Sequence, residues 1–107
     1  MAKGLLYVAT RPVSAERAAD YHAWYDKVHV PEVVALDGFV SARRLEPLDD
    51  DGPFVALYEI EGDDLKEIVR GLNRAIRNGE LHMSDAMSMD PPPEMRLLRT
   101  TLEYPES

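Results

Sequence analysis

Residues 21–39, YHAWYDKVHVPEVVALDGF, carry the pattern that decides the fold. Apolar and aromatic side chains recur here at the three- and four-residue spacing of one helix face, which predicts a helix running to about His29. Pro31 disfavours helical geometry at the residue before it, so we expect the helix to end there and a short turn to begin. An Asp-Gly pair then signals a turn, after which residues 39–45 have the composition of a strand.

The flanking segments extend this alternation of strands and helices. Ser14 is a good N-cap for the first helix, and Asp63 or Asp64 can cap a second helix that Gly79 should stop. Strands are predicted over 4–10, 39–45, 54–60 and 95–104, and helices over 14–29 and 64–78. This order, β-α-β-β-α-β, is the ferredoxin-like α+β arrangement, an antiparallel four-stranded sheet with both helices on one face. Residues 1–107 should form a single domain.

Both faces of the expected sheet are apolar, although two helices can cover only one of them. In the first strand Leu5 and Tyr7 alternate with Leu6 and Val8, and the third strand has the same character. A half-exposed antiparallel sheet should be polar on its outer face. We therefore expect a homodimer in which two copies pack sheet against sheet.

The composition excludes several classes of function. A formal net charge of −8 argues against nucleic acid or an anionic membrane surface as a partner. With no cysteine, the chain has neither disulfides nor Cys-based metal sites. No apolar run approaches the length of a membrane span, and the N-terminus lacks the layout of a signal peptide, so we expect a cytoplasmic protein.

Residues 24–44 resemble a known family. A histidine before Val-Pro-Glu, followed by a Gly-Phe step into a strand, is similar to the helix-to-strand block of EthD-like proteins in the dimeric α/β-barrel superfamily. Many relatives have Pro where this chain has Asp37, a change that a turn tolerates. The resemblance implies two protomers joined through their sheets, each with a pocket between sheet and helices. Members include polyketide cyclases, decarboxylases, muconolactone isomerases, cofactor-free monooxygenases and haem-dependent enzymes.

His29 is the strongest candidate for chemistry. At the expected end of the helix, the negative end of the macrodipole favours the imidazolium ion and should raise the basicity of His29. Asp26, three residues earlier, could hydrogen-bond one ring nitrogen and orient the other as a general base. Tyr25 lies between His22 and His29 on the same face, and its hydroxyl could hold a phenol or enolate oxygen. The alternative for His29 is a capping role in which it bonds only backbone carbonyls.

His22 and Trp24 are candidates for substrate contact. His22 lies two turns before His29, roughly 10 Å away at the ~1.5 Å rise per residue of a helix. One metal ion could hardly be bound by both histidines, and the sequence offers no compact third ligand, so we expect no metal site. The two rings could still contact opposite ends of one elongated ligand. For both His22 and Trp24 the alternative is ordinary packing in the core.

Arg43 and Met87 complete the candidate site. Arg43 and Arg44 point to opposite faces of their strand, so at most one should reach a pocket, where it would bind a carboxylate or enolate. The alternative for Arg43 is a salt bridge at the surface or in a dimer interface. Met87 belongs to the long connection of residues 80–93, whose methionines offer adaptable apolar surface for a lid over a ligand, or simply fill a gap.

These residues lead to three hypotheses. The first is a cofactor-independent enzyme that acts on a small hydrophobic or aromatic, polyketide-like or catabolic substrate. His29 would transfer a proton next to a carbonyl, a step that serves isomerisation, cyclisation and decarboxylation alike. The second is a non-catalytic module that binds a hydrophobic ligand in the same pocket. The third, implied by the superfamily, is a cofactor-free monooxygenase or a haem-binding protein with His29 as an axial ligand.

Overall fold

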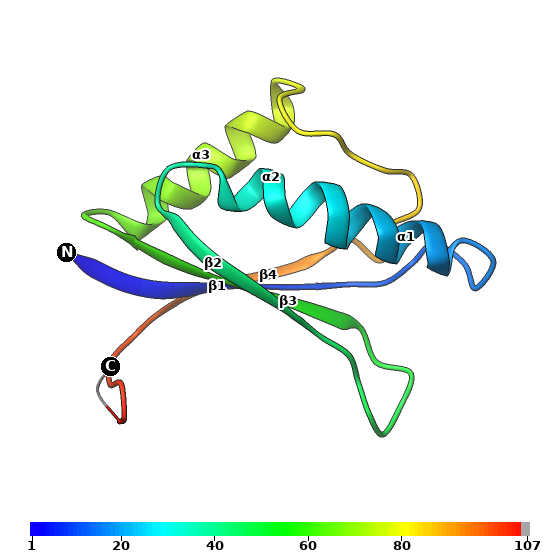
Figure 1. Ribbon diagram of the computed structural model, residues 1–107, viewed down its shortest axis with the longest axis horizontal. Coiled ribbons are helices and arrows are strands. Elements are labelled where there is room, and N and C mark those ends of the chain that lie inside the picture. The colour runs from blue at the N-terminus through cyan, green and yellow to red at the C-terminus, as the bar shows by residue number, and fades with distance from the viewer. Residues whose placement is uncertain (106–107) are drawn as a thin grey trace.

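The computed structural model describes residues 1–105 of the 107-residue chain and has the predicted ferredoxin-like order of elements. The sheet order is β2-β3-β1-β4, and all three pairs of neighbouring strands are antiparallel. Figure 1 shows the helices together on one side of this sheet. The elements are β1 (Ala2–Thr10), α1 (Ala18–Trp24), η1 (Tyr25–His29), α2 (Val30–Val34), β2 (Phe39–Leu45), β3 (Phe54–Gly62), α3 (Leu65–Arg77) and β4 (Glu94–Arg99).

The core lies between the sheet and the helices. It is built from the side chains of β1 and β3 that face the helices, together with the inner faces of α1–α2 and α3. Its largest fully buried members are Tyr21, Tyr25, Tyr58, Leu6, Ile60 and Val33. Three of these six are tyrosines, so the core contains phenol hydroxyls that need hydrogen-bond partners. Among the described residues, no helix has the length and apolar character that a membrane crossing requires.

The first helix differs from the prediction at both ends. The hydroxyl of Ser14 accepts a bond from the Arg17 amide at 3.3 Å within a turn, and the α-helix begins only at Ala18. Pro31 does not end the helix, because η1 is a π-helical turn that joins α1 to α2 and the chain stays helical to Val34. The Val30 amide donates to the Tyr25 carbonyl, five residues back. Pro31 has no N–H and cannot donate a helical hydrogen bond. The hydrogen-bond register changes in the π-helical turn directly before Pro31.

The helix α3, which is the second of the two predicted helices, agrees closely with the prediction. Asp64 is its N-cap, and its carboxylate accepts a hydrogen bond from the Glu67 amide at 3.2 Å. Gly79 follows the helix with φ +72°, a conformation that glycine adopts without strain. This helix places Leu72 and Ile76 above the sheet, where they form part of the wall of a cavity.

A β-bulge in β2 decides which arginine faces the helices. Phe39 is buried and pairs with β3, but the register shifts between Phe39 and Ser41. Beyond the bulge, Ala42 and Arg44 face the helices, and Arg43 is exposed on the other side of the sheet. A one-residue shift moves each following side chain to the opposite face. Arg43 therefore lies away from the covered face, and the expectation that it reaches the pocket is wrong.

Candidate functional site

A cavity of about 170 Å³ lies between the sheet and the helices. An engineered apolar cavity of about 150 Å³ binds benzene, so this space suits a ligand built on a single ring. Apolar side chains line most of it, and four of them are methionines: Met83, Met87, Met89 and Met95. The polar groups among the lining residues are those of Thr10, Tyr25, His29 and Tyr58. Three residues predicted for the site, His29, Tyr25 and Met87, are thus brought together here.

His29 is buried, with 9% of its surface exposed. Its ring stacks on Trp24 with a centroid distance of 4.6 Å and an interplanar angle of 24°, and it meets the ring of Tyr25 edge-on at 5.2 Å. Nδ1 is shielded from solvent and has no hydrogen-bond partner among the described residues. Trp24 therefore contacts the candidate base itself, and it is not among the residues that line the cavity.

Burial lowers the pKa of His29 from 6.5 to about 4, although the nearby carboxylate of Glu32 acts in the opposite direction. The ring is consequently neutral at pH 7. The sequence-based expectation of raised basicity is wrong for two reasons. The helix continues through His29, so the ring is not at a helix end, and desolvation of the imidazolium outweighs the nearby negative charge.

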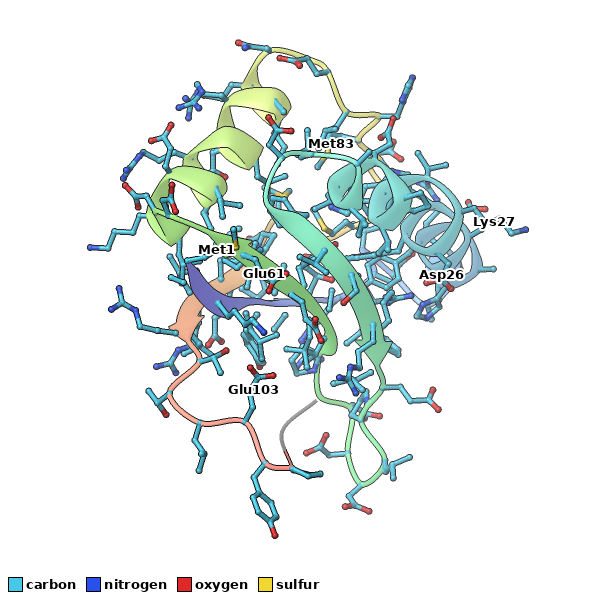
Figure 2. All side chains as sticks on the ribbon, turned by 60° about the vertical axis from the view of Figure 1, so that its left-hand side comes forward. Met1, Asp26, Lys27, Glu61, Met83 and Glu103 are labelled. Carbon is cyan, nitrogen blue, oxygen red and sulfur yellow. The ribbon has the colours of Figure 1, made fainter. Side chains whose placement is uncertain are left out.

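Asp26 does not orient His29. Its carboxylate accepts a hydrogen bond from Arg44 Nη1 at 2.9 Å, and its side chain is 58% exposed. Figure 2 shows Asp26 on the outer side of the helix, away from α3. The predicted pairing assumed the three-residue spacing of an α-helix, whereas the π-helical turn between the two residues changes their relative direction.

Arg44, which lies on the covered face, binds Asp26 and contacts the aromatic side chains beside the cavity, but it is not among the residues that line the cavity. Nη1 also donates to His22 Nδ1 at 3.2 Å, so the proton of a neutral His22 ring lies on Nε2. The guanidinium carbon is 4.3 Å from the ring centre of Tyr25, a cation–π contact. His22 packs edge-on against Tyr21 and Phe54 and does not line the cavity. His22 therefore contacts Arg44 and the surrounding aromatic rings, and not the cavity.

Tyr58, on β3, is a site residue that the sequence analysis missed. Its hydroxyl is buried near the side chain of Tyr25, makes no hydrogen bond of acceptable geometry among the described residues, and belongs to a side chain that lines the cavity. Burial raises the pKa of Tyr58, and also that of Tyr25, so both phenols keep their protons at neutral pH. The available signal was the alternation of Phe54, Ala56 and Tyr58, which places a phenol on the covered face of a central strand.

The loop of residues 80–93, here named the methionine loop, closes the cavity. In Figure 1 it runs from the end of α3 past α1 to β4. The Val13 amide donates to the Ala86 carbonyl at 2.7 Å, and the Ser88 amide donates to the Arg11 carbonyl at 2.8 Å. These two bonds flank Met87, which is buried and lines the cavity.

Two side chains of the first helix also hold the methionine loop. Trp24 Nε1 donates to the His82 carbonyl at 2.7 Å. The carboxylate of Glu32 bonds the His82 amide at 2.8 Å and His82 Nδ1 at 2.6 Å, and these bonds lower the pKa of Glu32. Neither Glu32 nor His82 was a predicted site residue. A pair fifty positions apart leaves no periodic signal in the sequence.

A second, larger hollow of about 640 Å³ lies between α3 and the turn at Leu36–Gly38. It is more open, has six acidic side chains among its fourteen lining residues, and includes none of the predicted site residues. Within residues 1–105, no three His, Cys, Asp or Glu side chains gather closely enough to hold a metal ion. We therefore place the candidate site at the smaller cavity, where the buried polar groups lie.

Comparisons with protein-family models, with curated proteins and with solved structures found no match to this chain.

Proposed function

We propose that this protein is a small enzyme that transfers a proton on a single-ring hydrophobic substrate without a dissociable cofactor. The observation that carries the proposal is the pair of buried, unpartnered polar atoms, His29 Nδ1 and the Tyr58 hydroxyl, on residues that line one apolar cavity. An unpartnered buried polar group costs about 1–3 kcal/mol, so it tends to persist only where it serves a purpose. A substrate with oxygen functions would supply the missing partners.

The proposed chemistry follows from the protonation states of these groups. A neutral imidazole has one nitrogen with a free electron pair, which can remove a proton from the carbon next to a carbonyl. The carbonyl oxygen then becomes an enolate, and a phenol that keeps its proton can donate a hydrogen bond to it. Tyr58 and Tyr25, which line the same cavity as His29, are the candidate donors. Return of the proton to another carbon of the substrate completes an isomerisation, with His29 neutral again.

The proposal is tested by proton exchange, which requires no knowledge of the natural product. Single-ring cyclic ketones are incubated in D₂O with the protein, and loss of the NMR signal of the hydrogens next to the carbonyl is followed. We expect exchange with the wild-type chain, none above background with His29→Gln, and full exchange with Lys27→Gln, an exposed residue of the same turn. Equal rates for wild type and His29→Gln would refute His29 as the base.

A specific observation favours the second candidate, a ligand-binding module. A histidine with a pKa of about 4 is a weak base in the free protein, which suits recognition as well as catalysis. Binding of a single-ring ketone without hydrogen exchange, measured by calorimetry and NMR on the same samples, would support this reading over the enzyme.

We also propose that two copies pair through the uncovered face of the sheet. Leu5, Tyr7, Val55 and Leu57 of the two central strands are half-buried there, and no helix lies on that side in Figure 1. Leu45 and Leu98 extend the apolar area to both edge strands. Arginines and glutamates on the same face can pair reciprocally when the patch meets its own copy about a twofold axis.

A further inference from the structure

Trp24 is the only tryptophan in the chain, and it joins two parts of the candidate site. One face of its ring stacks on His29 at 4.6 Å, while Nε1 donates to the His82 carbonyl in the methionine loop at 2.7 Å. A single rigid side chain thus contacts both the proposed base and the segment that closes the cavity over it.

Glu32 ties the same segment to the same helix. A carboxylate can only accept hydrogen bonds, so its contact with His82 Nδ1 at 2.6 Å makes that nitrogen a donor. The second oxygen accepts the His82 amide at 2.8 Å. His82 is thus held by three hydrogen bonds, one from Trp24 and two to Glu32. Trp24 and Glu32 lie on either side of His29 in the sequence.

We propose that Trp24 is a positioning residue that couples closure of the methionine loop to the state of His29, with Glu32 holding the loop closed. When the loop is closed, Met83, Met87 and Met89 shield the cavity and Trp24 lies flat against the imidazole. When His82 is released, Trp24 loses its anchor and water gains access to His29. Opening of the loop would widen the access of a ligand to the cavity. The inference rests on the proposed role of His29, although its test does not.

The surroundings of His29 make the consequence measurable, because two effects of Glu32 oppose each other. The titratable groups around the ring are Glu32 on α2, Tyr25 in η1 and Tyr58 on β3, and both tyrosines are neutral at the pH of interest. The charge of Glu32 raises the pKa of His29, whereas burial lowers it more strongly. Removing the charge alone would therefore lower the pKa further. Opening the loop would hydrate the ring and raise the pKa toward 6.5.

The experiment is the Glu32→Ala variant, studied by ¹⁵N NMR of the histidine rings over a pH titration and by hydrogen exchange of backbone amides. We expect the pKa of His29 to rise from about 4 toward 6.5. We also expect the His82 amide to exchange about tenfold faster, because it loses a charge-assisted hydrogen bond. Glu67→Ala removes a carboxylate on α3 that bonds only Arg70 and Arg74 among side chains, and it should change neither quantity.

A second variant keeps the inference testable if Glu32→Ala fails to fold. Trp24→Phe retains a ring that can stack on His29 but lacks the Nε1–H group that holds the loop, so it too should raise the pKa of His29. A fall or no change in the His29 pKa in the folded variant would overturn the proposed coupling. Neither readout depends on turnover, so absence of hydrogen exchange on a substrate would refute the proposed enzyme without deciding the coupling.

Discussion

Buried His29 should make this protein lose stability in mild acid, and His29→Phe should remove that loss. The folded-state pKa of about 4 lies below the value of 6.5 for the free side chain. As the pH falls below 6.5, the unfolded chain binds a proton at His29 while the folded chain does not. The stabilising contribution is therefore complete above pH 6.5 and is lost as the pH falls toward 4.

The magnitude follows from the two pKa values. At about 1.4 kcal/mol per pKa unit, a pKa lowered from 6.5 to about 4 corresponds to about 3 kcal/mol of free energy of unfolding. About 2.5 kcal/mol of this should be lost between about pH 7.5 and about pH 4.5, because the folded chain also begins to bind the proton at the lower value. That loss is a large part of the total stability of a small domain.

Urea unfolding at the two pH values, followed by circular dichroism, measures this contribution. The acid-induced loss should be smaller in His29→Phe than in wild type by about 2.5 kcal/mol, because losses at shared surface carboxylates cancel in the comparison. Val33→Ala is the control, because it truncates another lining residue that has no titratable group. It should lower the free energy of unfolding by the same amount at both pH values. Identical acid-induced losses in wild type and His29→Phe would show that folding does not lower the pKa of His29.

Three further substitutions test the hydrogen bonding of Tyr58, the pairing of two copies and the contacts of Arg44. Tyr58→Phe removes an unpartnered buried hydroxyl, so the free energy of unfolding should stay the same or rise by about 1 kcal/mol in urea titrations. Calorimetry of the same variant with a ketone ligand should show weaker binding by about tenfold, and unchanged binding would exclude Tyr58 as a donor. Leu57→Lys places a charge at the centre of the uncovered face and should convert a dimer to a monomer in light scattering, whereas a wild-type monomer would contradict the proposed pairing. Arg44→Met removes the cation–π contact and the bond to Asp26. It should lower the free energy of unfolding by about 2 kcal/mol in urea titrations. An unchanged free energy of unfolding would mean that the contacts of Arg44 do not stabilise the fold.

Sequence patterns predicted most elements of this fold because the fold depends on local rules. The stripe beginning at Leu65, with Asp64 before it and Gly79 after it, is enough to place α3. Strand composition and the turns between strands placed β2 and β3 in the same way. The effect of Pro31 was not predictable, since it depends on the hydrogen-bond register of the preceding turn, and a π-helical turn has no sequence signature comparable to a cap.

The candidate site was predicted in part, for a related reason. His29 and Tyr25 were identified because a helical face is periodic, and Met87 because loop methionines often cover ligands. Strict alternation from buried Phe39 would place Arg43 on the covered face, whereas the bulge places Arg44 there. Contacts between distant segments, such as that of Glu32 with His82, depend on the assembled fold and carry no local signal.

The π-helical turn explains how Pro31 shapes the site. A regular α-helix could not continue into Pro31 without losing a hydrogen bond to the residue four positions back. The wider turn at Tyr25–His29 changes the register ahead of the proline, and Asp26 then meets Arg44 while His29 lies buried at the cavity. Packing alone does not account for the outcome, because a leucine at position 29 would fill the space without leaving a polar atom unpartnered. A neutral, buried histidine with an unpartnered nitrogen lowers the free energy of unfolding. Binding of a polar group to that nitrogen in the cavity can offset this loss of stability.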